Sequence, residues 1–448
     1  MQILDKKIVG QIWSLAWPTA LYSLLQVVVG IADLLMVGHL GSTAIAAVGM
    51  SRQIIIVVLI LVLTVSTGAT TMIAQFFGAG RRKDVDNAGS QAVKMMAMLS
   101  FIIGPLGFFL ARPMLLAVGA EPQVLSEGTS YIRIYFATII FVNLNFCVAA
   151  ILRGAGDAKT PLKIALVVNA VNVLVNWLFI YGVWVFPKLG VPGAAVGTAA
   201  GRLAGMIIGL TILFNGGKRV RLHVREILRF DFSMMWRILR IGIPSALQGV
   251  SRTSARVAFL GVVATTAFAT NAAASLSIGL QTRLLFIMPA LAFQVAVVAL
   301  VGQNLGAGRL KQAERIAWEG TKVVGIGLTV AGVLLAVFAR QVMQSFTGES
   351  EVIEIGTVMM YYFCASQVFS GLAIVISGGL TGAGMTRPAM WYTIVCQWVI
   401  TLPAAWYLSH YTSLGLHGAW IMWTVGPALQ LVLTVRKFAS GRWKTYRT

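Results

Sequence analysis

Twelve long apolar stretches limit what this chain can fold into. They centre on residues 12–37, 53–76, 92–111, 131–152, 163–185, 193–215, 242–264, 276–301, 321–339, 355–377, 389–409 and 419–435. A helix of about 20 apolar residues crosses the hydrocarbon core of a bilayer. Only 11% of the residues are charged, whereas a soluble domain has about 25%. The sequence therefore predicts an all-α integral membrane protein with twelve transmembrane helices.

Lysine and arginine are distributed unevenly over the loops between these stretches. If the N-terminus is cytoplasmic, only Arg112, Lys188 and Arg340 fall in loops on the other side. Because positive charge is retained on the cytoplasmic side, we expect a multi-pass protein of the plasma (inner) membrane with both termini cytoplasmic. Contact between the basic loops and the anionic inner leaflet explains the net charge of +21 without a nucleic-acid partner.

The two halves of the chain carry matching motifs. Gln75-Phe-Phe-Gly-Ala-Gly-Arg81 follows the second stretch and returns as Gln303-Asn-Leu-Gly-Ala-Gly-Arg309 after the eighth. Arg153-Gly-Ala-Gly follows the fourth stretch and returns as Thr381-Gly-Ala-Gly after the tenth. Internal repeats are typical of secondary transporters, so we expect two pseudo-symmetric bundles of six helices.

A basic segment near the middle separates these halves. We predict an N-lobe at 1–215 with spans one to six, and a cytoplasmic linker with an amphipathic helix at 216–240. A C-lobe at 241–435 holds spans seven to twelve, and a basic cytoplasmic tail follows at 436–448.

Together these features resemble the multidrug and toxic compound extrusion (MATE) family, in the DinF/NorM-like bacterial or archaeal branch of the MOP flippase superfamily. The resemblance covers nearly the whole chain and rests on the two six-span halves, the paired Gln-x-x-Gly-Ala-Gly-Arg loops and Gly-Ala-Gly-Asp-x-x-x-Pro after span four. It implies an exporter of organic cations and other toxic amphiphiles that works by alternating access, in exchange for protons or sodium.

Asp33 is the one acidic residue that falls well inside an apolar stretch. A carboxylate at membrane depth is costly, and such groups often mark an ion or proton path. Asn172 and Asn176 lie four residues apart and therefore share one helix face. The resemblance implies a cation site where Asp33 meets these two amides and the Thr198 hydroxyl. A purely structural role, as hydrogen bonds between helices, stays open for these polar residues.

The coupling ion follows from the number of acids at this site. Many DinF-like members have an aspartate where this chain has Asn176, so Asp33 is alone. Desolvation favours the neutral form of a carboxyl, whereas sodium needs several oxygen ligands and benefits from fixed negative charge. We therefore predict H+ as the coupling ion, with Na+ at the Asp33 site as the alternative.

Other residues of the first span have candidate roles in the same cavity. Proline removes a backbone hydrogen bond and lets a helix bend. The resemblance implies that Pro18 is a hinge that responds to protonation of Asp33, although a structural kink is the alternative. Tyr22 and Gln26 are candidate cavity residues.

Three arginines lie in or near spans of the C-lobe, namely Arg252, Arg256 and Arg283. Sodium-coupled relatives have an acid where this chain has Arg252, so no second cation site is expected. Arginines inside a membrane need partners. They either bind backbone carbonyls near the span ends or contact anionic parts of a substrate. The second reading suits a flippase for an anionic lipid-linked or amphiphilic substrate, which remains the alternative function.

The sequence lacks the residue patterns that an enzyme or a metal site would require. The four histidines have no ligand spacing, and Cys147, Cys364 and Cys396 all fall in apolar stretches, so we expect no enzyme, no metal site and no cofactor. We predict a monomer that binds membrane lipids and small amphiphilic, mainly cationic organic substrates.

The predicted orientation is testable with single cysteines in a background without the three native ones. Cysteines at Ser42 and Thr412 should react with an impermeant thiol reagent added outside the cell, because both lie in predicted external loops. A cysteine at Ser440 should react only after the cells are opened. The reverse pattern would contradict the orientation.

Overall fold

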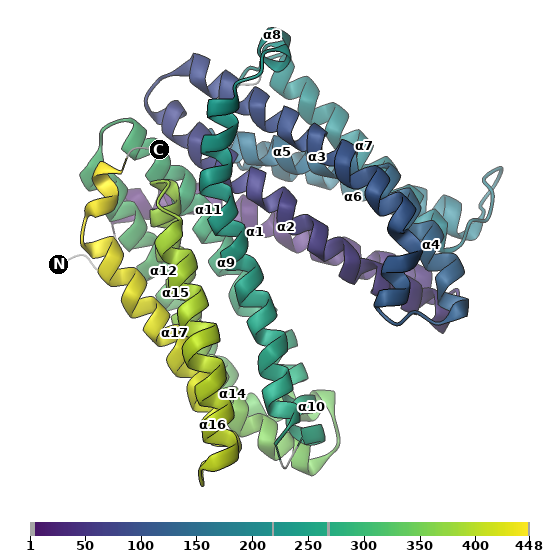
Figure 1. The fold of residues 1–448 in the computed structure, drawn as a ribbon, viewed down its shortest axis with the longest axis vertical. Coiled ribbons are helices and arrows are strands. Elements are labelled where there is room, and N and C mark those ends of the chain that lie inside the picture. Colours follow the sequence, from purple (N-terminus) through teal and green to yellow (C-terminus); the bar gives the residue numbers. More distant parts are fainter. Residues whose placement is uncertain (1–4, 217–218, 267–268, 447–448) are drawn as a thin grey trace. The chain divides into compact units, whose positions relative to one another are not determined.

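The computed structural model describes residues 5–216, 219–266 and 269–446. These residues form helices and their connections, without a strand (Figure 1). The first helices are α1 (Lys6–Gly38), α2 (Ser42–Gly78), α3 (Arg82–Ala117), α4 (Pro122–Ala137), α5 (Ile139–Gly154), α6 (Lys159–Tyr181), α7 (Val191–Phe214) and α8 (Val224–Leu228). They are followed by α9 (Phe232–Ala264), α10 (Ala269–Thr282), α11 (Leu284–Gly306), α12 (Leu310–Val337), α13 (Ala339–Phe346), α14 (Ser350–Gly382), α15 (Arg387–Ile394), η1 (Val395–Thr401), α16 (Leu402–Tyr411), α17 (Leu416–Ala439) and η2 (Arg442–Thr445).

The chain divides into two compact units, and the boundaries between them fall inside two helices. Unit 1 consists of Met1–Ala16 and Ile243–Thr448, and unit 2 consists of Trp17–Gly242. The helices α1 and α9 therefore belong partly to each unit, although each stays continuous through its internal proline, Pro18 or Pro244. The limits predicted for the lobes, the linker and the tail stay predictions.

Most of the predicted spans correspond to single long helices. Within the described ranges, nine helices are long and apolar enough to cross a membrane, and α4 and α5 form a further candidate that is bent by 51°. Two predicted spans fall outside this group. One lies in α9, where Arg252 and Arg256 interrupt the apolar sequence. The other, 389–409, is divided among α15, the π-helical segment η1 and α16, each of which is short.

In unit 2, one face of α7 is a row of glycines that lets neighbouring helices approach its backbone. The row consists of Gly193, Gly197, Gly201, Gly205 and Gly209, which are four residues apart. A Cβ atom on Gly197 would lie 1.9 Å from Asn176 Oδ1, and one on Gly201 would lie 2.6 Å from the carbonyl oxygen of Val168. Small residues at such spacing drive helix packing in membranes. The row thus places α6 directly against α7.

The first turns of α9 pack on α2 through a reciprocal pair of glycines. A Cβ atom on Gly68 would lie 2.1 Å from the carbonyl oxygen of Ile238. Likewise, a Cβ atom on Gly242 would lie 1.9 Å from the carbonyl oxygen of Thr64. Each glycine therefore accommodates the backbone of the other helix, and no larger residue fits at either position without a shift.

The segment that precedes α9 is held on the start of α3. The Asp86 carboxylate accepts hydrogen bonds from the backbone N–H of His223 at 3.0 Å and lies 2.6 Å from His223 Nδ1. Asp231 accepts from the backbone N–H of Met234 at 2.9 Å and from Asn87 at 2.7 Å. These hydrogen bonds, the Met234 one first, hold the pKa of Asp231 below its usual value. The predicted amphipathic end of the linker is continuous with α9.

Unit 1 is built around α14, the most buried of its apolar helices. A Cβ atom on Gly382 would lie 2.6 Å from the carbonyl oxygen of Val298 on α11, so these two helices also meet at their backbones. At the end of the chain, Trp443 is fully buried and stacks on Phe438 with ring centroids 4.7 Å apart. This stacking fixes η2 on α17.

Substituting Gly242 tests the glycine pair. Gly242→Ala should destabilise the protein by about 1–3 kcal/mol, a typical cost of an overpacked contact, because its new methyl group collides with the Thr64 carbonyl. Gly249→Ala is the matched control on the same helix, since a Cβ atom there meets nothing within 4 Å. The measurement is the melting temperature in detergent by size-exclusion chromatography with fluorescence detection. Equal melting temperatures for the two variants would contradict the contact.

Candidate functional site

Asp33 lies on α1 where this helix meets α6. The Asn176 amide Nδ2 donates a hydrogen bond to Asp33 Oδ1 at 2.5 Å, and it lies 3.4 Å from Asn172 Oδ1 on the same face of α6. The Asn172 Nδ2 atom in turn lies 3.4 Å from the Thr198 hydroxyl on α7. The structure thus brings together the four polar residues that the sequence predicts for the cation site. Their function remains a prediction.

Rotating the side-chain amide of Asn172 by half a turn, which exchanges its nitrogen and oxygen, improves the hydrogen bonding of these four residues. In that orientation its Nδ2 donates to Asp33 Oδ1 at 3.0 Å and its oxygen accepts from the backbone N–H of Thr198 at 3.1 Å. The Asp33 carboxylate then receives two amide N–H groups, one from each asparagine. Both donors stabilise the charged form of this partly buried carboxylate.

Arg202 is a further charged neighbour, which the sequence reasoning left outside the site. It lies one turn after Thr198 on α7, and its Nη2 donates to Gln26 Oε1 at 2.6 Å. The guanidinium groups of Arg202 and Arg52 also act on Asp33 as positive charges. The i, i+4 relation to Thr198 was the sequence signal that could have placed Arg202 here.

The remaining candidates on α1 lie further from Asp33. Gln26 is two turns before it and contacts Arg202 rather than the carboxylate. Tyr22 is buried against Leu162 and Ala165 of α6, and the Arg153 guanidinium lies 5.5 Å from its ring centroid. Pro18 lies inside the continuous helix α1 and is buried. The hinge and cavity roles of these residues stay predictions.

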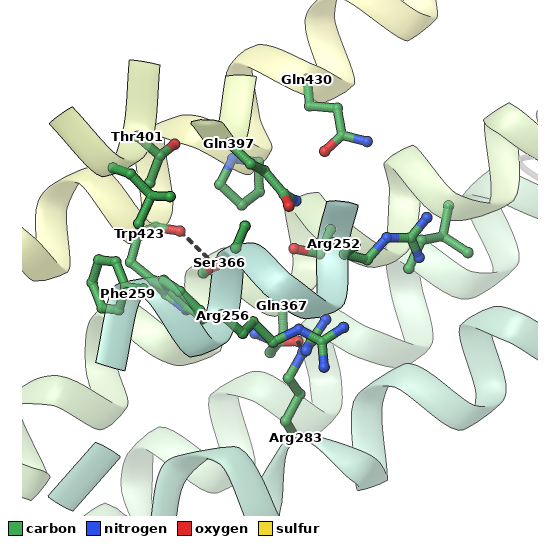
Figure 2. Close-up of a pocket in the computed structure, with 15 residues that line it drawn as sticks. Arg252, Arg256, Phe259, Arg283, Ser366, Gln367, Gln397, Thr401, Trp423 and Gln430 are labelled. Atoms are coloured by element: carbon green, nitrogen blue, oxygen red, sulfur yellow. Dashed lines mark hydrogen bonds between the residues drawn. The ribbon is translucent and has the colours of Figure 1, made fainter. Parts of the chain in front are cut away.

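The three arginines of the C-terminal half that the sequence indicated as candidate cavity residues line one pocket in unit 1 (Figure 2). Arg252 and Arg256 come from α9, and Arg283 lies just before α11. Arg283 is only 5% exposed, and its Nε donates to Gln367 Oε1 on α14 at 3.0 Å. Figure 2 shows the side chains of Arg256 and Arg283 converging beside Gln367. The partner of Arg283 in this hydrogen bond is a side chain and not a backbone carbonyl, which was one of the two kinds of partner that the sequence left open.

The opposite wall of the pocket comes from η1 and α17. In the π-helical segment, the Thr401 hydroxyl donates to the carbonyl oxygen of Cys396, five residues earlier, at 2.7 Å. A Cβ atom on Gly426 of α17 would lie 1.9 Å from this hydroxyl. The widened turn and the close glycine place Gln397 and Trp423 at the pocket. Single π turns often occur at functional sites.

Comparisons with known proteins agree with this architecture. The model of the family described as MatE matches residues 18–178 and 244–407. The chain belongs to the MatE family. Its two matched segments carry the repeated motifs of the two halves. The all-α membrane fold and the family predicted from the sequence are thereby confirmed, and the protein is a multi-pass membrane transporter.

Individual relatives and solved structures of MatE proteins cover nearly the whole chain. The probable multidrug resistance protein NorM of Thermotoga maritima is 28% identical, with 96% of this chain and 92% of the relative covered. The probable multidrug resistance protein YoeA of Bacillus subtilis is 26% identical, with 93% and 90% covered. The crystal structure of a MATE protein in the bent conformation has a TM-score of 0.88 at 23% identity, covering 97% of this chain and 95% of that one. This last similarity shows the fold.

Proposed function

We propose that this MatE protein is a secondary multidrug exporter that exchanges its substrates for protons, with Asp33 as the protonation site. The observation that carries the proposal is the hydrogen bond from the Asn176 amide to the Asp33 carboxylate, between two membrane helices. The helices α1, α6 and α7 contain no carboxylate other than that of Asp33. A single acid that gains and loses a proton changes its hydrogen bonds with both asparagines.

The arrangement around Asp33 favours a proton over sodium. The amides direct N–H groups at the carboxylate, whereas a hard cation needs several oxygen ligands. The positive charges of Arg202 and Arg52 oppose the binding of sodium and of a proton alike, so the preference rests on the ligands. Protonation only removes the charge of Asp33 and requires no set of ligands.

The substrates are small amphiphilic organic compounds in this proposal, as the names of the multidrug resistance relatives suggest. Proton exchange would drive them outward by alternating access, with Pro18 as the hinge of α1.

We further propose a monomer in the inner membrane, with both termini cytoplasmic and with basic loops on the anionic leaflet. Sodium coupling and a flippase for an anionic amphiphile are the alternatives. The arginines of the unit 1 pocket favour an anionic group over a cationic one at that position.

Removing the Asp33 charge tests the protonation site. Asp33→Asn should reduce the drug resistance of a sensitive host to that of cells without the transporter, because asparagine cannot exchange a proton. Expression and elution in size-exclusion chromatography should stay unchanged. Glu354→Gln is the matched control, since it removes one exposed acid elsewhere on the chain. Full resistance of the Asp33 variant at equal expression would exclude this role.

The coupling ion is tested in proteoliposomes with one gradient imposed at a time. A proton gradient should drive substrate movement in the absence of sodium. Asn176→Asp adds a second acid beside Asp33, and we expect it to shift the pH optimum or to introduce sodium dependence. Asn215→Asp adds the same charge at the exposed end of α7 and should do neither. Transport that needs sodium and ignores a pH gradient would favour the alternative.

A further inference from the structure

The pocket in unit 1 concentrates positive charge without a compensating acid. Its lining includes Arg252, Arg256 and Arg283 and contains no aspartate or glutamate. The three guanidinium groups are close enough to repel one another. On α14, the acids nearest in sequence lie in its first turns, and Glu354 precedes the lining residue Ser366 by three helical turns. Buried like charges are costly unless a counter-charge pairs with them.

Several hydrogen-bond donors of the pocket lack a partner as well. Within the described part of the chain, Arg256 Nε, Arg283 Nη1 and Trp423 Nε1 are buried and make no hydrogen bond. Gln397 Oε1 is an unpaired acceptor in the same lining, and rotation of its amide would present a further donor. Native proteins seldom leave so many buried polar atoms unsatisfied in one place. The site therefore lacks an acceptor that carries negative charge.

The size and the walls of the pocket indicate what this acceptor is. The space that water can reach is about 50 Å³, which accommodates a few water molecules or one oxyanion group. Phe259 and Trp423 lie in the same lining, with ring centroids 4.2 Å apart. Phe259 is fully buried behind Trp423, and the partly exposed ring of Trp423 offers an aromatic surface beside the charged end. Guanidinium groups bind carboxylates and phosphates through paired hydrogen bonds.

We propose that this pocket binds the carboxylate, sulfonate or phosphate group of an aromatic or otherwise amphiphilic organic anion. Arg256 and Arg283 hold the oxyanion, Gln367 orients Arg283, and Trp423, supported by the buried Phe259, contacts the apolar part. Calling this anion a substrate rests on the proposed exporter function. The binding site itself does not, because equilibrium binding requires no ion gradient. A lipid phosphate and a free organic anion present the same chemistry to these residues.

Fluorescence anisotropy with the purified full chain in nanodiscs of zwitterionic lipid tests the site. Fluorescein is the anionic aromatic probe, and rhodamine 6G is a cationic dye of similar size. Fluorescein should bind more weakly as the salt concentration rises, and rhodamine 6G should not displace it. Arg256→Gln combined with Arg283→Gln should weaken fluorescein binding at least ten-fold. Arg340→Gln removes an exposed arginine of the same unit and should leave binding unchanged.

Further measurements distinguish a lipid phosphate from a free organic anion. They also test the site without relying on the folding of the double variant. Competition by phosphatidylglycerol in the nanodisc would support the site and identify a lipid phosphate as its occupant, whereas undisturbed fluorescein binding supports a free organic anion. If the double variant is unstable, pyrophosphate should raise the melting temperature of the unmodified protein more than chloride at equal ionic strength. The proposal is overturned if rhodamine 6G competes with fluorescein, if the folded double variant binds fluorescein normally, or if pyrophosphate has no such effect.

Discussion

The glycine face of α7 is the constraint on which the site around Asp33 depends. Lipid tails are as apolar as the helices, so membrane helices associate through close packing and hydrogen bonds rather than through the hydrophobic effect. The space beside Gly197 is filled by the Asn176 side chain, and the space beside Gly201 by the α6 backbone. With α6 at this distance, Asn172 and Asn176 lie between Asp33 and Thr198. A bulkier residue on this face would separate the amides from the carboxylate.

The two units treat buried charge in opposite ways. In unit 2, the negative charge of Asp33 is met by amide donors and by positive charges at a greater distance. In unit 1, three arginines share a pocket whose described residues supply a single acceptor, Gln367, to one of them. In the proposed function the Asp33 carboxyl exchanges a proton, and in the proposed anion site the missing acceptor comes from outside the chain. The two sites thus differ in the sign of their buried charge.

Much of the fold was predictable because hydropathy and helical periodicity reflect local physics. The spacing of Asn172 and Asn176 placed both on one face, and the isolation of Asp33 singled it out. The same spacing rule would have added Arg202 and the glycines of α7, which are visible in the sequence. The π-helical turn and the close approach of Gly426 to Thr401 were not predictable, because they join residues that are distant in sequence. Consequently the positions of Gln397 and Trp423 at the pocket became visible only in three dimensions.

The first turns of α1 belong to a unit whose other residues come late in the sequence, and this affects the order of folding during synthesis. Residues 5–16 leave the ribosome well before Ile243, at which the rest of their unit begins. Ile12 packs near Gly320, and the Trp13 ring lies 5.9 Å from that of Phe293. These partners are synthesised only after more than half of the chain, although domains generally fold in the order in which they emerge. The first turns of α1 therefore reach their final packing only after these partners have been made, long after their own synthesis.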